Sequence, residues 1–102
     1  MSAKKLKTAP LEKFIGRVTT DTELGPLYRD VMQAASITVV DRITATFHRP
    51  SPQQDMIHAN DFEKKRQALF AACHRRDIST PLGFTLLSCQ RFILREMLLH
   101  LH

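Results

Sequence analysis

The stretch PLGFTLLSCQRFILREMLLHL, residues 81–101, decides the fold. Twelve of its twenty-one residues are apolar, and on a helical wheel the polar side chains leave only a narrow stripe. A helix that is apolar on nearly all sides is normally buried by several neighbours. Thr80 is a good N-cap, and Pro81 is tolerated in a first helical turn. The sequence therefore predicts a long apolar C-terminal helix from about Pro81 to Leu101.

This segment does not read as a membrane span, because Arg91, Arg95 and Glu96 interrupt it and a span needs about 20 nearly uncharged residues. The chain has 102 residues, of which 43% are hydrophobic and 25% charged, as in a single globular domain. The other helices of so small a domain would leave part of this helix uncovered, as a larger apolar patch than monomers usually expose. A two-fold contact with a second copy would cover it. A monomeric bundle that buries the helix completely is the alternative. The predicted dimer or partner interface consists of Leu86, Phe92, Ile93, Leu94, Met97, Leu98 and Leu101.

Three further segments have helical spacing. Asn60 and Glu63 form a capping box that predicts a helix to about Arg76. Gly25-Pro26 begins another helix that we expect to reach about Phe47, and a short helix follows Pro10. Residues 1–8 read as a flexible basic tail, 9–102 as one helical domain, and the Pro-containing segment at about 49–59 as a loop. The predicted fold class is therefore all-α, a small bundle of three or four helices.

Residues 37–47 are ambiguous between helix and strand. Ile37, Val39, Ile43, Ala45 and Phe47 alternate as in a half-buried strand, and β-branched residues are frequent. A strand needs a partner strand, however, and no other segment alternates comparably. We expect a helix here; the alternative is an edge strand that pairs across a dimer.

No residue pattern indicates catalysis or metal binding. The serines lack a neighbouring base pattern, and there is no glycine-rich phosphate loop. Cys73 and Cys89 fall on apolar helix faces, and their spacing to the histidines differs from the close ligand pairs of structural zinc sites. We expect no enzyme activity, no metal and no cofactor. No apolar region follows the basic start as in a signal peptide, so free thiols in the cytoplasm are expected.

The net charge of +5 makes nucleic acid a plausible partner. The helix that ends at Arg76 carries most of the candidate phosphate contacts, although a solvated polar face is the ordinary explanation for such charges. A DNA-reading helix-turn-helix does not fit, because the second helix is almost wholly apolar. The candidate nucleic-acid contacts are Lys4, Lys5, Lys7, Lys64, Lys65, Arg75 and Arg76.

The sequence matches no family closely. Its composition and its apolar C-terminal helix favour a non-enzymatic regulatory or adaptor protein that acts through helix-mediated protein contacts and self-association. A nucleic-acid-binding regulator that uses the basic tail and basic helix is the second hypothesis.

Overall fold

The computed structural model describes residues 3–44 and 52–100 of the chain. They form four helices and no strand: α1 (Ala3–Thr19), α2 (Leu24–Thr44), α3 (Pro52–Arg75) and α4 (Leu86–His100). The predicted all-α class is confirmed, and residues 37–44 are helical; residues 45–47 lie outside the described part.

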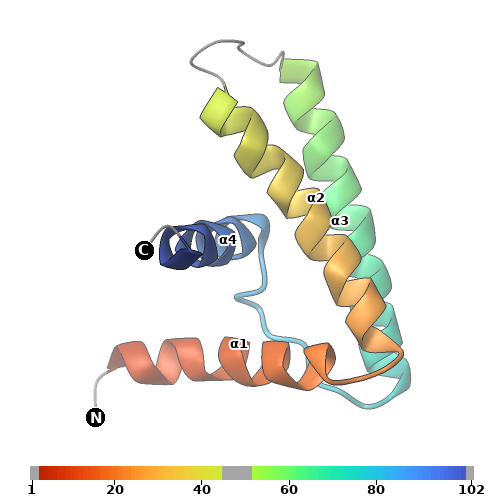
Figure 1. The fold of residues 1–102 in the computed structure, drawn as a ribbon. Helices are drawn as coiled ribbons and strands as arrows, with labels where there is room; N and C mark the ends of the chain where they lie inside the picture. The colour runs from red at the N-terminus through yellow and green to blue at the C-terminus, as the bar shows by residue number, and fades with distance from the viewer. Residues whose placement is uncertain (1–2, 45–51, 101–102) are drawn as a thin grey trace.

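The helices α2 and α3 form a long hairpin, and α1 and α4 extend away from it on the same side (Figure 1). The helix α1 crosses the end of the hairpin where α2 begins, and α4 packs on α2. The molecule measures 43 × 32 × 24 Å. Its radius of gyration of 14.8 Å exceeds the roughly 13 Å typical of 100 residues, which reflects these two projecting helices.

Two helices begin earlier than predicted. Residues 3–8, expected as part of a flexible tail, belong to α1, because the run from Ala3 to Lys7 consists of strong helix formers. Pro10 consequently lies inside the helix rather than at its start. The helix α3 begins at Pro52 instead of Asn60, because Pro52 suits a first helical position and the glutamines after it favour helix. The predicted loop at 49–59 is therefore helical from residue 52 onward.

The helix α4 begins later than predicted, at Leu86. The backbone N–H of Ser88 donates to Thr85 Oγ1 at 3.2 Å, and the N–H of Thr85 donates to Ser88 Oγ at 2.9 Å. This reciprocal capping box starts the helix five residues after Thr80, the predicted cap. The intervening residues turn, with the N–H of Phe84 donating to the carbonyl of Pro81 at 3.3 Å.

Phe84 is the centre of an aromatic cluster that joins the helices. Its ring centroid lies 5.5 Å from Phe14 of α1, 6.2 Å from Tyr28 of α2 and 5.8 Å from Phe70 of α3. Edge and tilted ring pairs at such distances stabilise a core beyond their area of contact. The α3–α4 turn thus folds so that Phe84 reaches the core, while Leu82 at its tip stays in solvent.

The end of α3 is closed by an αL residue. The N–H of Ile78 donates to the carbonyl of Cys73 at 2.9 Å, and that of Asp77 to His74 at 3.2 Å. Asp77 has a φ of 57°. These two bonds define a Schellman motif, in which the residue after the cap is usually glycine.

Candidate protein-interaction surface

One face of α4 packs on the protein body and the rest is open to solvent. Cys89 and Gln90 are buried, and Leu86 and Ile93 pack against the core. The prediction that this helix is buried on several sides is wrong for a single chain, because α1 and α4 diverge and only α2 covers α4 closely. The apolar side chains left exposed on α4 are Leu87, Phe92, Leu94, Met97, Leu98 and Leu99.

The structure leaves some of the predicted interface residues exposed and packs others against the core. Phe92, Leu94, Met97 and Leu98 are exposed as an interface requires. Leu86 and Ile93 are not available to a partner, since they point toward the core. Leu87 and Leu99 are exposed at 54% and 59% and were missed, because an almost uniformly apolar helix does not reveal which face is covered. Leu101 lies outside the described residues.

A groove of about 640 Å³ separates α4 from α1. Residues of α2 and the core, including Tyr28, Met32 and Phe84, form its floor. Such a volume lies within the range of ordinary ligand and peptide sites. Its walls are formed by Leu11, Glu12, Ile15 and Gly16 of α1 and by Ser88, Cys89, Arg91, Phe92, Arg95, Glu96 and Leu99 of α4.

The groove contains charges of both signs. Glu12 of α1 and Arg91, Arg95 and Glu96 of α4 all line it. Among the described residues, none of these four side chains makes an ion pair or hydrogen bond. Burial and the nearby charge of Glu96 raise the pKa of Tyr28 to about 12, so its phenol stays neutral at physiological pH. The groove therefore carries two carboxylates and two guanidinium groups that have no ion-pair or hydrogen-bond partner among the described residues.

A second, smaller hollow of about 340 Å³ lies on α4 itself. It is lined by Arg91, Leu94, Arg95 and Leu98, with Leu99 beside them. The first four have the i, i+3, i+4, i+7 spacing of the hole that receives one side chain of a neighbouring helix in a coiled coil. The outer ridge of α4 thus has the form that helix-on-helix packing uses.

Gln90 is the polar residue buried on the inner face of α4. It is 5% exposed, and its Nε2 has no hydrogen-bond partner in the part of the chain that the structure describes. A buried amide without a partner lowers stability by about 1–3 kcal/mol. This position weakens the attachment of α4 to the body of the protein.

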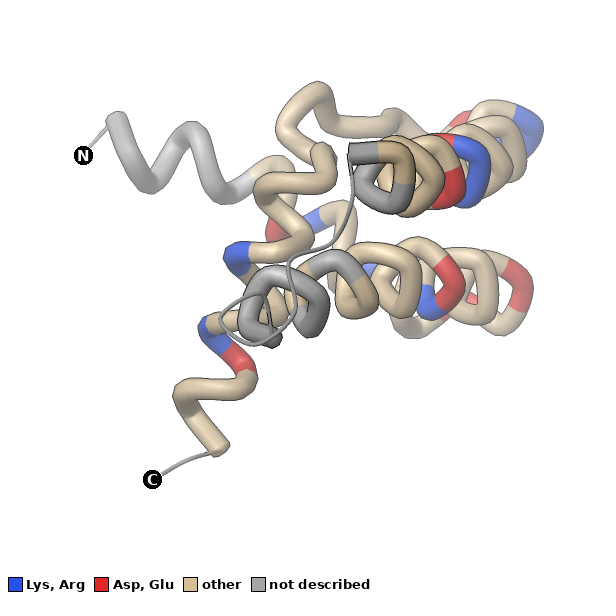
Figure 2. Tube along the Cα trace, turned by 90° about the horizontal axis from the view of Figure 1, so that it is seen from above, with Lys and Arg blue, Asp and Glu red and all other residues tan. Residues whose placement is uncertain are grey.

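The predicted basic helix corresponds to the second half of α3 and the residue after it, and two of its four candidate cations are already paired. Lys65 pairs with Asp61 at 3.3 Å, and Arg76 binds Asp21 at 2.6 Å. Acidic residues lie among the basic ones on the hairpin helices (Figure 2). Lys64 and Arg75 are exposed and share one face of α3, eleven residues apart. The side chains of Lys4, Lys5 and Lys7 lie outside the described part of the structure.

Arg66 of α3 makes two further contacts, and one of them gives Glu63 a different role from the predicted one. Glu63, predicted to cap a helix, instead accepts from Arg66 Nε at 3.0 Å, and this contact lowers the pKa of Glu63. The guanidinium of Arg66 also lies 5.1 Å from the ring centre of Phe70, a cation–π distance. Glu63 and Phe70 of α3 are therefore both in contact with Arg66.

Both cysteines are free and buried, as predicted. Burial raises the pKa of Cys73 and raises that of Cys89 to about 11, so both are thiols rather than reactive thiolates. Within residues 3–44 and 52–100, no three His, Cys, Asp or Glu side chains are grouped to hold a metal ion. No helix in that part of the chain has the length and apolarity to cross a bilayer.

Comparison with protein-family models, with curated proteins and with solved structures finds no match to this chain. The fold and its surface are therefore the basis on which a function is proposed.

Proposed function

We propose that this protein is a non-enzymatic regulatory or adaptor protein that acts through helix-mediated protein contacts, beginning with its own self-association. The observation that carries the proposal is the set of six exposed apolar side chains on the single helix α4. Contiguous apolar surface on this scale marks an interaction site more often than ordinary surface. A reducing, cytoplasmic setting is part of the proposal, because both cysteines are free and buried.

The energetics favour an association of moderate strength. Completing the burial of a half-exposed Leu, Phe or Met side chain contributes about 1 kcal/mol. Two copies that cover their α4 side chains therefore gain roughly 10 kcal/mol, against an association cost of about 4–15 kcal/mol. The net association free energy is then at most about −6 kcal/mol, so we expect a dimer with a dissociation constant of roughly tens of micromolar or weaker.

Light scattering after size exclusion, at protein concentrations from a few micromolar to several hundred, tests this proposal. Leu98→Glu places a charge on α4 at a position that is 60% exposed in the single chain and should give a monomer at every concentration. Leu82→Glu is the matched control, because Leu82 is 98% exposed but lies in the α3–α4 turn. A wild-type protein that stays monomeric at the highest concentration contradicts the proposal.

Nucleic-acid binding is the second candidate, and the exposed pair Lys64 and Arg75 is what favours it. Arg76 is not a suitable residue for testing nucleic-acid binding, because it is bound to Asp21 and replacing it would perturb the fold as well as the charge. Lys64→Ala combined with Arg75→Ala removes two exposed cations instead. If these contact phosphates, the slope of log K against log salt should become shallower by up to about two. No gel shift of generic duplex DNA at 50 mM salt and micromolar protein would exclude this candidate.

A further inference from the structure

We propose that the groove between α1 and α4 binds one molecule of a single-chain zwitterionic amphiphile, a ligand with an alkyl tail and a headgroup that carries both a phosphate and a quaternary ammonium. This binding takes place within one chain, so it does not depend on the proposed self-association.

The interior of the groove suits an alkyl chain. Ile15 of α1, Met32 of α2 and Phe92 of α4 line it from three sides. Its volume of about 640 Å³ lies in the range of sites that hold a drug-sized ligand. A helix of about ten residues, about 15 Å long and about 10 Å across, would occupy roughly twice that volume. The groove therefore fits a single extended chain better than a helix of another protein.

The charged side chains that line the groove are separated by sign. Arg91 and Arg95 are one helical turn apart and line both the groove and the hollow on α4, so they stand on the lip between the two. Glu96 lines the groove and not the hollow, and its charge acts on the phenol of Tyr28 in the floor. Glu12 stands on the opposite wall, which α1 forms. The groove thus has cations at its lip and carboxylates near its floor and far wall.

The aromatic rings near the carboxylates suit a quaternary ammonium group. Tyr28 and Phe84, whose ring centroids lie 6.2 Å apart, belong to the floor, and Phe92 stands on the α4 wall. Such rings attract a quaternary ammonium through their faces, and this cation needs no hydrogen-bond acceptor. Glu12 and Glu96 add the opposite charge. We therefore assign the ammonium end of the ligand to this side of the groove.

The two arginines at the lip suit the phosphate. Guanidinium groups bind phosphate oxygens through charge-assisted hydrogen bonds, and two of them one turn apart can share one phosphate. A purely anionic ligand would leave Glu12 and Glu96 without an opposite charge, and a purely cationic one would leave Arg91 and Arg95 without one. A zwitterion provides a partner for both pairs, which is why we choose it over an amphiphile of one sign.

Dodecylphosphocholine, titrated below its critical micelle concentration, is the probe. Tyr28 is the sole tyrosine of a chain without tryptophan, so the intrinsic fluorescence comes from the floor of the groove. Cys89 lines the groove and Cys73 does not. We expect a saturable change in tyrosine fluorescence, together with slower thiol labelling of Cys89 and unchanged labelling of Cys73.

Two double variants test the headgroup. Arg91→Gln with Arg95→Gln, and Glu12→Gln with Glu96→Gln, should each weaken binding of the probe by about tenfold or more. All four positions are exposed, so both variants should fold, which circular dichroism verifies. The first variant should prefer dodecyltrimethylammonium to the probe's phosphate-only analogue, dodecyl phosphate, and the second should show the opposite preference, because each keeps one sign of charge.

Gly16 provides a test of the location. It lines the groove, and a Cβ there would meet nothing within 4 Å, so a larger side chain projects into open space. Gly16→Leu should abolish binding with helicity intact. Gly83→Leu, at a glycine that also has open space but does not line the groove, should bind as wild type. Lys64→Gln with Arg75→Gln, two exposed cations on α3, is the matched charge control and should also bind as wild type.

Several results would overturn the proposal. They are a titration that does not saturate below the critical micelle concentration, faster labelling of both cysteines, and charge variants or Gly16→Leu that bind the probe as tightly as wild type. Phosphatidylcholine vesicles that produce both effects when the monomeric probe produces neither would show a membrane surface as the ligand instead. Light scattering measures self-association separately, so a failure of either property leaves the other to be judged on its own.

Discussion

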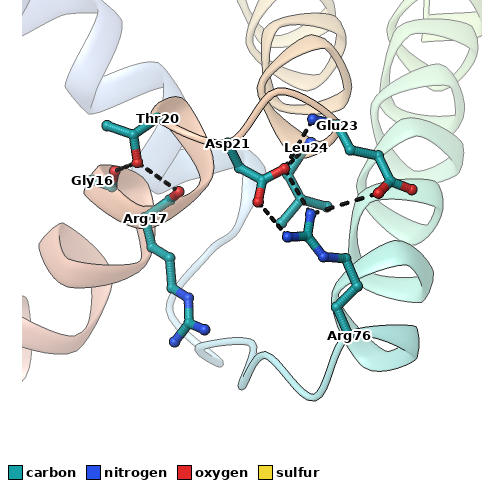
Figure 3. A network of polar contacts seen from close by, with 7 residues as sticks. All are labelled: Gly16, Arg17, Thr20, Asp21, Glu23, Leu24 and Arg76. Atoms are coloured by element: carbon teal, nitrogen blue, oxygen red, sulfur yellow. Dashed lines mark hydrogen bonds and ion pairs between the residues drawn. The ribbon is translucent and has the colours of Figure 1, made fainter.

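Asp21 and Arg76, 55 residues apart, are joined by two contacts of 2.6 Å, Nη1 to Oδ1 and Nη2 to Oδ2 (Figure 3). Asp21 Oδ1 also accepts from the backbone N–H groups of Glu23 and Leu24 at 2.9 and 3.0 Å. One carboxylate therefore caps α2 and ties its first turn to the end of α3. The hydrogen bond from Arg76, together with the backbone donors, holds the pKa of Asp21 well below its ordinary value of 3.8.

The lowered pKa of Asp21 predicts an acid-sensitive contribution to stability. Because the folded-state pKa lies below the unfolded one, this contribution is complete above the unfolded value of about 3.8 and is lost as the pH falls toward the folded value. Asp21→Asn keeps the cap but removes the charge. Its melting temperature should fall less than that of wild type between pH 5 and pH 2. Glu23→Gln, at the 3.7 Å contact with Arg76, should leave the wild-type fall in place, and an equal fall in all three proteins would refute the assignment.

Phe84 and Leu82 lie two residues apart in the same turn, but truncating Phe84 should destabilise the protein strongly and truncating Leu82 hardly at all. Phe84 is 1% exposed at the centre of the aromatic cluster, and Leu82 is 98% exposed. Phe84→Ala should lower the free energy of unfolding by about 3–5 kcal/mol. Leu82→Ala should change it by less than about 0.5 kcal/mol. Denaturant unfolding at a concentration where the protein is monomeric measures both changes in the free energy of unfolding. Similar losses in the two variants would show that the conformation of the turn is wrong.

The sequence predicted which segments are helical better than it predicted where they begin. Apolar periodicity and the absence of a partner strand identified α2 and α3, because these signals extend over many residues. The start of α4 was misplaced because Thr80-Pro81 and Thr85 with Ser88 are both good caps, and only the burial of Phe84 selects the second. Local capping signals do not show which of two candidates brings a distant aromatic ring into the core.

The sequence predicted that the candidate surface lies on the C-terminal helix, but it did not predict which face of that helix is exposed. Leu86 and Leu87 are neighbours of the same residue type, yet the first packs on the core and the second is exposed. Only the direction from which α2 approaches decides between them. The groove depends on α1 and α4, two helices whose relative position no local pattern determines.

Asp77 offers a stabilising substitution. Its φ of 57° is unfavourable for a residue with a Cβ, and its carboxylate stands at the end of α3, where the helix dipole disfavours negative charge. Asp77→Gly should raise the free energy of unfolding by about 0.5–1 kcal/mol. Asp77→Ala removes the charge but keeps the strained backbone and should gain less. Equal gains in the two variants would show that charge, not conformation, is responsible.

The buried thiols should react slowly. Cys89 is 3% exposed with a pKa raised to about 11, and Cys73 is fully buried with its pKa also raised. Labelling at pH 8 should be slow for the native protein and fast in denaturant, and it should accelerate as the pH rises toward 11. Mass spectrometry of digested protein assigns each site. Rapid labelling of either cysteine without denaturant would contradict the packing of α3 and α4.

Gln90 tests how firmly α4 is held. Its Nε2 is buried without a partner, so an apolar side chain of similar size removes an unsatisfied donor without opening a cavity. Gln90→Met should raise the free energy of unfolding by about 1 kcal/mol, whereas Gln90→Ala should lower it, because it replaces the unpaired amide with a cavity. The matched control is Gln67→Met on exposed α3 surface, which should change stability by less than about 0.5 kcal/mol. A loss of stability in Gln90→Met would show that the Gln90 amide has a hydrogen-bond partner. Gln90 would then stabilise the attachment of α4 to the core instead of weakening it.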